Sequence, residues 1–237
     1  PPPPTGWGAT TAAVTFEYEP QHKFMGDERE LALMVRTLHD VKASAYFEWG
    51  TGGTTLRLPQ LLVESEHGAP FAVAVEHSAK WARNVSRWLH ELSPALARRV
   101  TVRHVEPTIK ALGGTFVEGT YESYGDYVDA VRTNSSRQFD VVLVDGRARI
   151  ACALATVIYG RLRRGGLLIM HDFTVRRPYY GLLQWFSITA LERSTVVLKP
   201  RGVTWSLGKH LNDERKARLV ATLERHALRV WHRGTLA

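Results

Sequence analysis

A glycine-rich run, Glu48-Trp49-Gly50-Thr51-Gly52-Gly53-Thr54-Thr55, is the part of the sequence best suited to hold a ligand. Glycines let the chain turn tightly, and they let a ligand approach the backbone closely. A dinucleotide-binding fingerprint requires a third glycine at the position of Thr55, and that glycine is missing. The run therefore predicts a ligand-binding turn that is not of the dinucleotide type.

Titratable side chains directly follow three further strand-like runs. They are Glu76 and His77 after 71–75, Asp145 after 139–144, and His171 and Asp172 after 166–170. Ligands of open α/β sheets bind outside the carboxyl ends of the strands, at the point where the strand order reverses. We therefore expect these side chains and the glycine-rich turn to surround one site.

Strand-like and helical patterns alternate along most of the chain. Strands are expected at 45–49, 71–75, 100–105, 139–144 and 166–170, with helices near 27–42, 54–66, 78–92, 123–133 and 150–163. Asp27 and Glu30 form a capping-box pattern at the start of the first helix. Alternation of this kind predicts a doubly wound, Rossmann-like α/β fold, with a mostly parallel sheet covered by helices on both faces.

The C-terminal part predicts an antiparallel edge. A helix is expected at 179–191, followed by strands at 195–198 and 203–207. The connection between these strands is too short for a parallel crossover, so it predicts a hairpin and a sheet of seven strands. A closing helix at 213–231 would complete one domain over 27–237, and the Pro-, Thr- and Gly-rich residues 1–26 are expected to form an arm.

The pattern Glu48-x-Gly50-x-Gly52, with Glu76 at the end of the second strand, resembles class I S-adenosylmethionine methyltransferases over about residues 27–208. The cofactor-binding residues implied by the resemblance are Glu48, Gly50, Gly52, Gly53, Thr54, Glu76 and His77. In that family the acid after the second strand accepts hydrogen bonds from both ribose hydroxyls, a task that suits two carboxylate oxygens. The alternative is a simple tight turn, with Glu76 favouring the dipole of the next helix.

Asp145, with His171 and Asp172, resembles the acidic positions of metal-dependent O-methyltransferases, including catechol-type and sugar enzymes. The resemblance implies Mg²⁺ or Mn²⁺ held by Asp145 and Asp172, where it would orient two hydroxyls and stabilise developing negative charge. His171 departs from the pattern, because those enzymes have a second acid there and hard cations prefer oxygen. Catalysis by Asp145 or His171 as a general base is one alternative, and a helix cap with loop hydrogen bonds is the other.

Basic and aromatic side chains are expected at the same edge of the sheet. The candidates for binding the acceptor are Arg147, Arg149, Arg176 and Tyr124. Guanidinium groups bind carboxylates or phosphates, and aromatic faces stack against sugars or other flat surfaces. We therefore expect methyl transfer to a hydroxyl of a glycan or another hydroxylated small molecule. An RNA methyltransferase and a catalytically silent binding domain are the alternatives.

Composition leaves the partner and the compartment open. The net charge of +8 suits a nucleic acid, an anionic glycan or a membrane surface, but a solvated basic surface gives the same balance. Sequons at Asn84 and Asn134 fit the lumen of the secretory pathway, such as the Golgi, while the sequence fits the cytoplasm equally. No Gly-x-Ser-x-Gly or Walker-type motif is present, so hydrolase and nucleotide-triphosphatase functions are unsupported.

Overall fold

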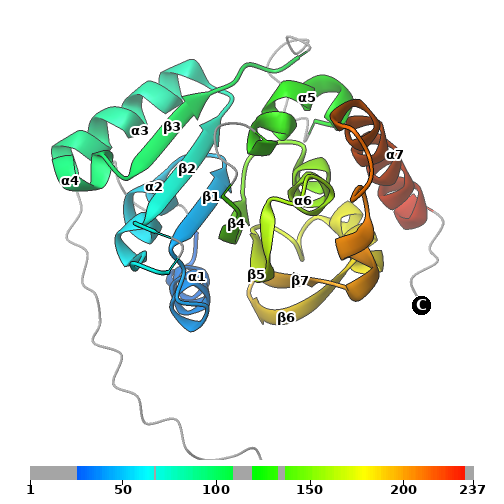
Figure 1. Cartoon of the computed structure of the whole chain (residues 1–237), viewed down its shortest axis with the longest axis horizontal. Helices are drawn as coiled ribbons and strands as arrows, with labels where there is room; N and C mark the ends of the chain where they lie inside the picture. Colours follow the sequence, from blue (N-terminus) through cyan, green and yellow to red (C-terminus); the bar gives the residue numbers. More distant parts are fainter. Residues whose placement is uncertain (1–25, 67, 109–118, 133–136, 233–237) are drawn as a thin grey trace, which may run out of the picture.

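The structure, a computed structural model, describes residues 26–66, 68–108, 119–132 and 137–232. A seven-stranded sheet with the order β3-β2-β1-β4-β5-β7-β6 forms its centre (Figure 1). The parallel strands are β1 (Ala45–Trp49), β2 (Phe71–Glu76), β3 (Val100–His104), β4 (Phe139–Val144) and β5 (Leu162–Met170), and the antiparallel edge consists of β6 (Phe186–Glu192) and β7 (Thr195–Pro200). The predicted fold class is therefore confirmed.

Helices cover both faces of this sheet, as Figure 1 shows. One face carries α1 (Glu28–Asp40), α2 (Gly53–Arg57), the 3₁₀ helix η2 (Leu58–Leu61), α3 (Ala79–Leu92) and α4 (Pro94–Ala97). The other carries α5 (Tyr121–Asp129), η3 (Ala130–Arg132), α6 (Arg149–Ile158), η4 (Arg177–Gln184), η5 (Gly202–Ser206) and α7 (Asp213–His232). Strand β4 lies between the two layers and is buried along its whole length. Its continuous apolar run fits this position, since strands covered on both faces lose the polar alternation.

The edge hairpin differs from the prediction in its strands. Residues 186–192 form β6 rather than the end of a helix, and β6 pairs with β7 through a turn at Arg193 and Ser194. Arg193 adopts a φ of 54°, so this turn lacks the glycine or proline that would have marked it in the sequence. The expected strand at 203–207 is wrong as well. Those residues form most of η5, where Thr204 Oγ1 donates to the carbonyl of Trp185 at 2.6 Å.

Several predicted boundaries also shift. Helix α6 ends at Ile158, and β5 begins at Leu162, four residues earlier than expected. Gly160, with a φ of 64°, supplies the left-handed residue that allows this abrupt change. The predicted helix near 54–66 breaks into α2 and η2, while the closing helix is confirmed as α7. The expected arm, apart from Gly26, and the sequon at Asn134 lie outside the described residues.

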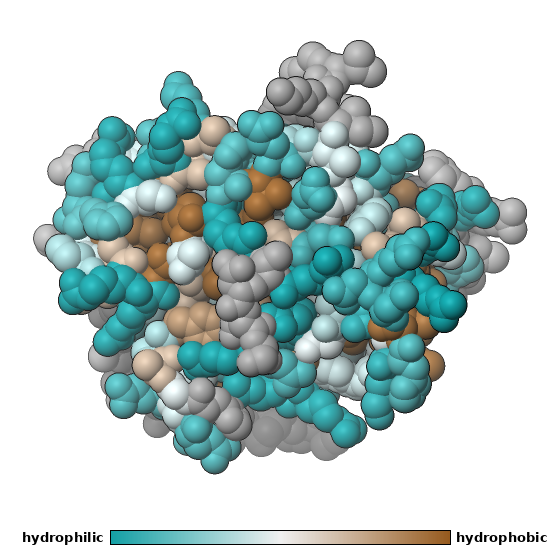
Figure 2. All heavy atoms as spheres, turned by 45° about the horizontal axis from the view of Figure 1, so that its top comes forward, coloured by the Kyte–Doolittle hydropathy of each residue, from teal (hydrophilic) through white to brown (hydrophobic). Residues whose placement is uncertain are grey.

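The surface of the described chain is mainly polar on the face that Figure 2 shows, with apolar side chains gathered in small patches. The sequon at Asn84 lies in the middle of α3. Among the described residues, no helix combines the length and the apolar character needed to cross a membrane.

Candidate active site

The register of the sheet brings four predicted site residues together at the carboxyl ends of its parallel strands. Trp49 is level with Val75 on one side and Val144 on the other, and Val144 is level with Met170. The residues that follow these positions, in order across the sheet, are Glu76, Gly50, Asp145 and His171. The strand order reverses between β1 and β4, so this edge is the place where such a fold binds ligands.

The glycine-rich turn after β1 needs glycine at Gly50 for close packing and leaves open space at Gly52. Gly50 has a φ of 89°, and a Cβ there would lie 2.8 Å from the amide nitrogen of Gly146. The turn after β1 therefore packs directly on the turn after β4. A Cβ at Gly52 would meet no atom within 4 Å. The chain thus leaves room for a ligand beside the backbone of Gly52.

Glu48 supports this turn from inside the protein. Its carboxylate is fully buried and accepts hydrogen bonds from the hydroxyl of Tyr46, at 2.7 Å, and from that of Thr55. Burial raises the pKa of Glu48 to about 7. The Thr55 hydroxyl also accepts from the amide of Gly52 at 2.9 Å. Glu48 is therefore placed to fix the shape of the turn, and Thr54 is buried beside it.

Glu76 joins the glycine-rich turn to the start of α3. Its Oε2 accepts from the amide of Thr51 at 3.0 Å, and its Oε1 accepts from the amide of Ser78 at 2.8 Å. The Nδ1 atom of His77 lies 2.8 Å from the same Oε1. Burial alone would raise the pKa of Glu76, but His77 and these backbone amides hold it below its ordinary value. The carboxylate is thus ionised and fixed in orientation beside the turn.

An aromatic group flanks Glu76. The ring of His77 makes edge contacts with Tyr124 and Tyr127, at centroid distances of 6.0 and 6.1 Å. The structure therefore places Tyr124 next to His77, one of the predicted cofactor residues. Trp81, which sequence reasoning missed, donates its indole N–H to the carbonyl of Thr51. The sequence feature that could have indicated Trp81 is its position in the first turn of α3, shortly after Glu76.

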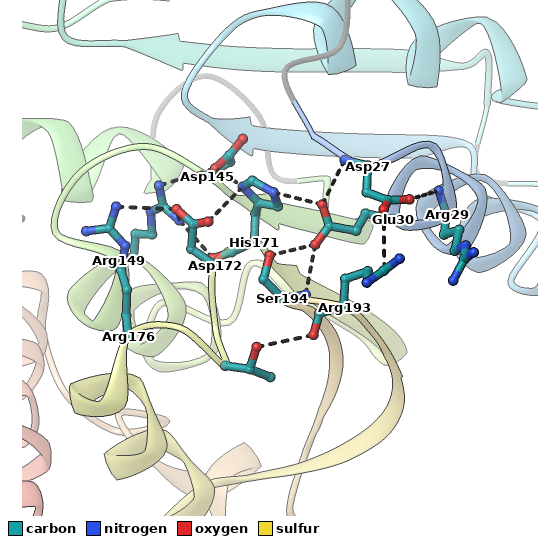
Figure 3. Close-up of polar contacts among 11 residues, drawn as sticks. Asp27, Arg29, Glu30, Asp145, Arg149, His171, Asp172, Arg176, Arg193 and Ser194 are labelled. Atoms are coloured by element: carbon teal, nitrogen blue, oxygen red, sulfur yellow. Dashed lines mark hydrogen bonds and ion pairs between the residues drawn. The ribbon is translucent and has the colours of Figure 1, made fainter.

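Asp145 and His171 belong to a chain of ionic contacts that reaches across the sheet edge to α1 (Figure 3). Nδ1 of His171 lies 2.9 Å from Oδ1 of Asp145, and its Nε2 lies 3.3 Å from Oε2 of Glu30. Glu30 Oε1 in turn accepts from the amide and hydroxyl of Ser194, at 2.9 and 2.6 Å. Sequence reasoning identified Glu30 as a capping residue, a role that is confirmed, but it missed the contacts with His171 and Ser194.

These contacts determine the charges of His171 and Glu30. Burial by itself would lower the pKa of His171, but Asp145, Asp172 and Glu30 raise it to about 9. Burial alone would also raise the pKa of Glu30, whereas hydrogen bonds from Ser194 and the backbone of Asp27, with the charge of His171, lower it to about 2. At neutral pH His171 is therefore an imidazolium between carboxylates.

The free energy of unfolding is therefore expected to depend on pH through His171. Its folded-state pKa of about 9 lies above the ordinary 6.5, so its contribution is complete below pH 6.5 and is lost as the pH rises through 9. The contribution is on the order of 3 kcal/mol. Urea denaturation between pH 6 and 10 measures it. His171→Gln should remove most of this pH dependence. His39→Gln, at an exposed position, is the control and should keep it. If the free energy of unfolding changes with pH to the same extent in both variants, the assignment to His171 is wrong.

Arg149 is buried at the centre of the same group. It donates to the carbonyls of Gly146 and His171, at 3.0 and 2.8 Å. Its two terminal nitrogens lie 3.3 Å from carboxylate oxygens of Asp145 and Asp172. Arg149 is only 7 % exposed, so it links the ends of β4 and β5 from inside. Direct binding of an acceptor by Arg149, as the sequence suggested, remains a prediction that this burial does not favour.

The other predicted arginines lie farther out. Arg176 is partly exposed and donates to Oδ2 of Asp172 at 3.3 Å, so Asp172 lies between two guanidinium groups. Arg147 is half-buried, and its carbonyl accepts a hydrogen bond from the thiol of Cys152.

A divalent cation does not fit this arrangement. Such ions need several oxygen ligands, but Oδ1 of Asp145 faces His171 and Arg149, and Oδ2 of Asp172 faces Arg149 and Arg176. In the part of the chain that the structure describes, no group of three His, Cys, Asp or Glu side chains is arranged to hold a metal. The positive charges next to these carboxylates come instead from the protein itself.

Solved structures with a similar fold include methyltransferases and a methyltransferase-like protein. A methyltransferase-like protein from Silicibacter pomeroyi matches with a TM-score of 0.59 and 24% identity, over 86% of this chain and 98% of that one. The chain has the fold of class I methyltransferases. An O-methyltransferase from Bacillus cereus, solved with S-adenosylhomocysteine (SAH), matches with a TM-score of 0.52 and 20% identity, over 76% of this chain and 82% of that one.

A methyltransferase from Geobacter sulfurreducens gives the same TM-score of 0.52 at 13% identity, over 75% of this chain and 80% of that one. No family model matches the sequence, and no curated protein matches it either. The likeness thus concerns the fold.

Proposed function

We propose that this protein transfers a methyl group from S-adenosylmethionine to a hydroxyl oxygen of a small acceptor molecule. The observation that carries the proposal is the alignment of the open glycine-rich turn, Glu76 and Asp145 along one sheet edge. The Bacillus cereus protein of the same fold is an O-methyltransferase solved with SAH, which supports both the cofactor and the acceptor atom.

The cofactor-binding part of this proposal assigns two roles. Gly52 leaves the space in which the cofactor can lie against the backbone, and Glu76 provides ionised oxygens for the ribose hydroxyls. When bound, S-adenosylmethionine supplies an electrophilic sulfonium methyl group. His77 and Tyr124 lie next to Glu76, where their rings can border the same ligand.

Asp145 is our choice for the residue that receives the proton. Its Oδ1 is held by His171 and Arg149, whereas its Oδ2 has no polar contact with the described residues and points away from the cluster in Figure 3. Oδ2 can accept a hydrogen bond from the acceptor hydroxyl. As the oxygen bonds to the methyl carbon and the carbon–sulfur bond breaks, the hydroxyl proton passes to Oδ2.

His171 then acts by positioning Asp145. An imidazolium with a pKa of about 9 has no lone pair to accept a proton at neutral pH, and both ring nitrogens already face carboxylates. We therefore favour general-base catalysis by Asp145 over the metal-assisted alternative. A sugar or glycan acceptor remains a prediction from the sequence.

Calorimetric titration with S-adenosylmethionine tests the cofactor assignment. Wild-type protein should bind, and Gly52→Val should bind about 100-fold more weakly or not at all, because the side chain fills the open space beside the turn. Gly202→Val is the matched control, since a Cβ at Gly202 also meets no atom within 4 Å but lies in η5. Unchanged affinity in Gly52→Val, with the fold intact by circular dichroism, would sink the assignment.

A further inference from the structure

A cavity of about 510 Å³ lies against η4, α7 and the first turn of α6. Its volume falls within the roughly 300–1,000 Å³ that is usual for pockets of small molecules. Five of its ten lining residues carry apolar side chains: Ile150, Val175, Pro178, Tyr179 and Leu228. Such a lining fits a ligand with a flat or aliphatic body better than a free sugar, whose hydroxyls would lack partners.

The walls of this cavity are closely packed. A Cβ at Gly181 of η4 would lie 2.5 Å from the carbonyl oxygen of Ala227 in α7, so these two elements are in direct backbone contact. At the other end, Glu224 of α7 accepts from the amide of Tyr121, the first residue of α5, at 2.8 Å. The cavity is therefore bounded by elements whose spacing is fixed by the fold.

The charged groups of the lining favour an anion. They are two adjacent guanidinium groups, Arg176 and Arg177, and one carboxylate, Glu224. Glu224 is 3 % exposed and accepts a hydrogen bond from the start of α5. Arg177 is at an exposed position, and Val175, 68 % exposed, lies beside the two arginines in the chain. Paired guanidinium groups suit planar oxyanions such as carboxylates.

The cavity also adjoins the residues of the proposed chemistry. Ile150 follows Arg149, the residue that contacts Asp145. Arg176 contributes to the lining and also contacts Asp172, which shares Arg149 with Asp145. The lining of the cavity is therefore connected to Asp145 through the ionic contacts of Arg176, Asp172 and Arg149.

We propose that this cavity is the acceptor pocket and that it takes a hydroxylated, largely apolar acid whose anionic group lies at Arg176 and Arg177. The inference rests on the proposed function, and it narrows the acceptor from hydroxylated molecules in general to amphiphilic acids. The apolar body lies between η4 and α7, and the hydroxyl is directed toward Asp145.

Binding of two fluorescent probes tests the pocket without any methyl transfer. Anilinonaphthalene sulfonate carries an apolar body and an anionic group, and phenylnaphthylamine has the same body without the charge. Arg177→Gln should weaken sulfonate binding about ten-fold and leave binding of the neutral probe nearly unchanged. Val175→Glu, which adds a negative charge to the lining, should weaken sulfonate binding at least as much. Both positions are exposed, so the fold should persist. Arg215→Gln, an exposed charge change on α7 outside the lining, is the control.

Competition then connects the pocket to the reaction. Hydroxyphenylpropanoate should displace the sulfonate probe and be methylated in the presence of S-adenosylmethionine, and its methyl ester should do both at least about ten-fold less well. If Arg177→Gln and Val175→Glu bind the sulfonate probe with the same affinity as Arg215→Gln, the cavity is not the binding site of the anionic group. Probe binding without methylation of any hydroxylated acid, in protein that binds S-adenosylmethionine, would overturn its assignment to the acceptor. Failure to bind S-adenosylmethionine at all would instead refute the proposed function.

Discussion

Replacing Asp145 with asparagine is expected to lower turnover by roughly 10²–10⁴-fold, the usual effect of losing a positioned base. Affinity for S-adenosylmethionine should stay the same, because the open turn at Gly52 and the carboxylate of Glu76 are untouched. The amide keeps the shape of the side chain but cannot take the proton of the acceptor hydroxyl. Turnover measured as release of SAH, beside calorimetric cofactor titration, separates the two effects.

Asp172→Asn is the matched control for this experiment. Asp172 is partly exposed like Asp145, but its Oδ2 is held between Arg149 and Arg176. Its loss should therefore affect turnover much less. Wild-type activity should also persist in excess chelator, because Oδ1 of Asp145 faces Arg149 and His171, and no three potential ligands among the described residues are arranged to hold a metal. Near-normal turnover in Asp145→Asn would place the chemistry at another strand end, and abolition of wild-type activity by chelator would restore the metal mechanism.

The sequence was sufficient to predict which residues share the sheet edge. The alternation of strand and helix patterns fixes a parallel sheet, and a parallel sheet puts the residue after each strand at the same end. Glu76, Gly50, Asp145 and His171 lie side by side for this reason. This part of the prediction depended on the backbone alone, and it was accurate.

Side-chain partners were beyond the same reasoning. Glu30 and His171 are 141 positions apart, and their contact depends on how α1 packs against the sheet edge. Arg149 was expected to face a ligand, but the buried first turn of α6 directs it inward toward Asp145 and Asp172. Spacing along the chain contains no direct information on such directions. The metal prediction was made from residue types alone and so could not anticipate that arginine lies between the carboxylates.

The hairpin was misplaced for a different reason. The apolar residues of η4 and β6 can be read as one helical stripe, since Leu182, Leu183 and Phe186 have helix-like spacing. The turn at Arg193 and Ser194 contains no glycine, so no local signal interrupted that stripe. Pairing with β7 decides the conformation, and strand pairing is a tertiary interaction that outweighs local pattern.

Arg149→Met is expected to lower the free energy of unfolding by about 3–5 kcal/mol, the usual cost of removing one partner of a buried ion pair. Methionine approximates the length of the arginine stem, but it leaves Asp145 and Asp172 close together without the intervening cation. The carbonyls of Gly146 and His171 lose a donor as well. Urea denaturation at neutral pH gives the change, and Arg164→Met, at an exposed position of β5, is the control.

A second variant distinguishes repulsion between the carboxylates from a simple loss of packing. In the double variant Arg149→Met/Asp172→Asn, one of the two carboxylates that lost Arg149 is neutral, so part of the lost stability should return. Coupled residues of this kind commonly show interaction energies of about 0.5–3 kcal/mol. If the double variant is less stable than Arg149→Met by the full effect of Asp172→Asn alone, the two residues are independent. Arg149 would then stabilise the strand ends only through its hydrogen bonds to the backbone.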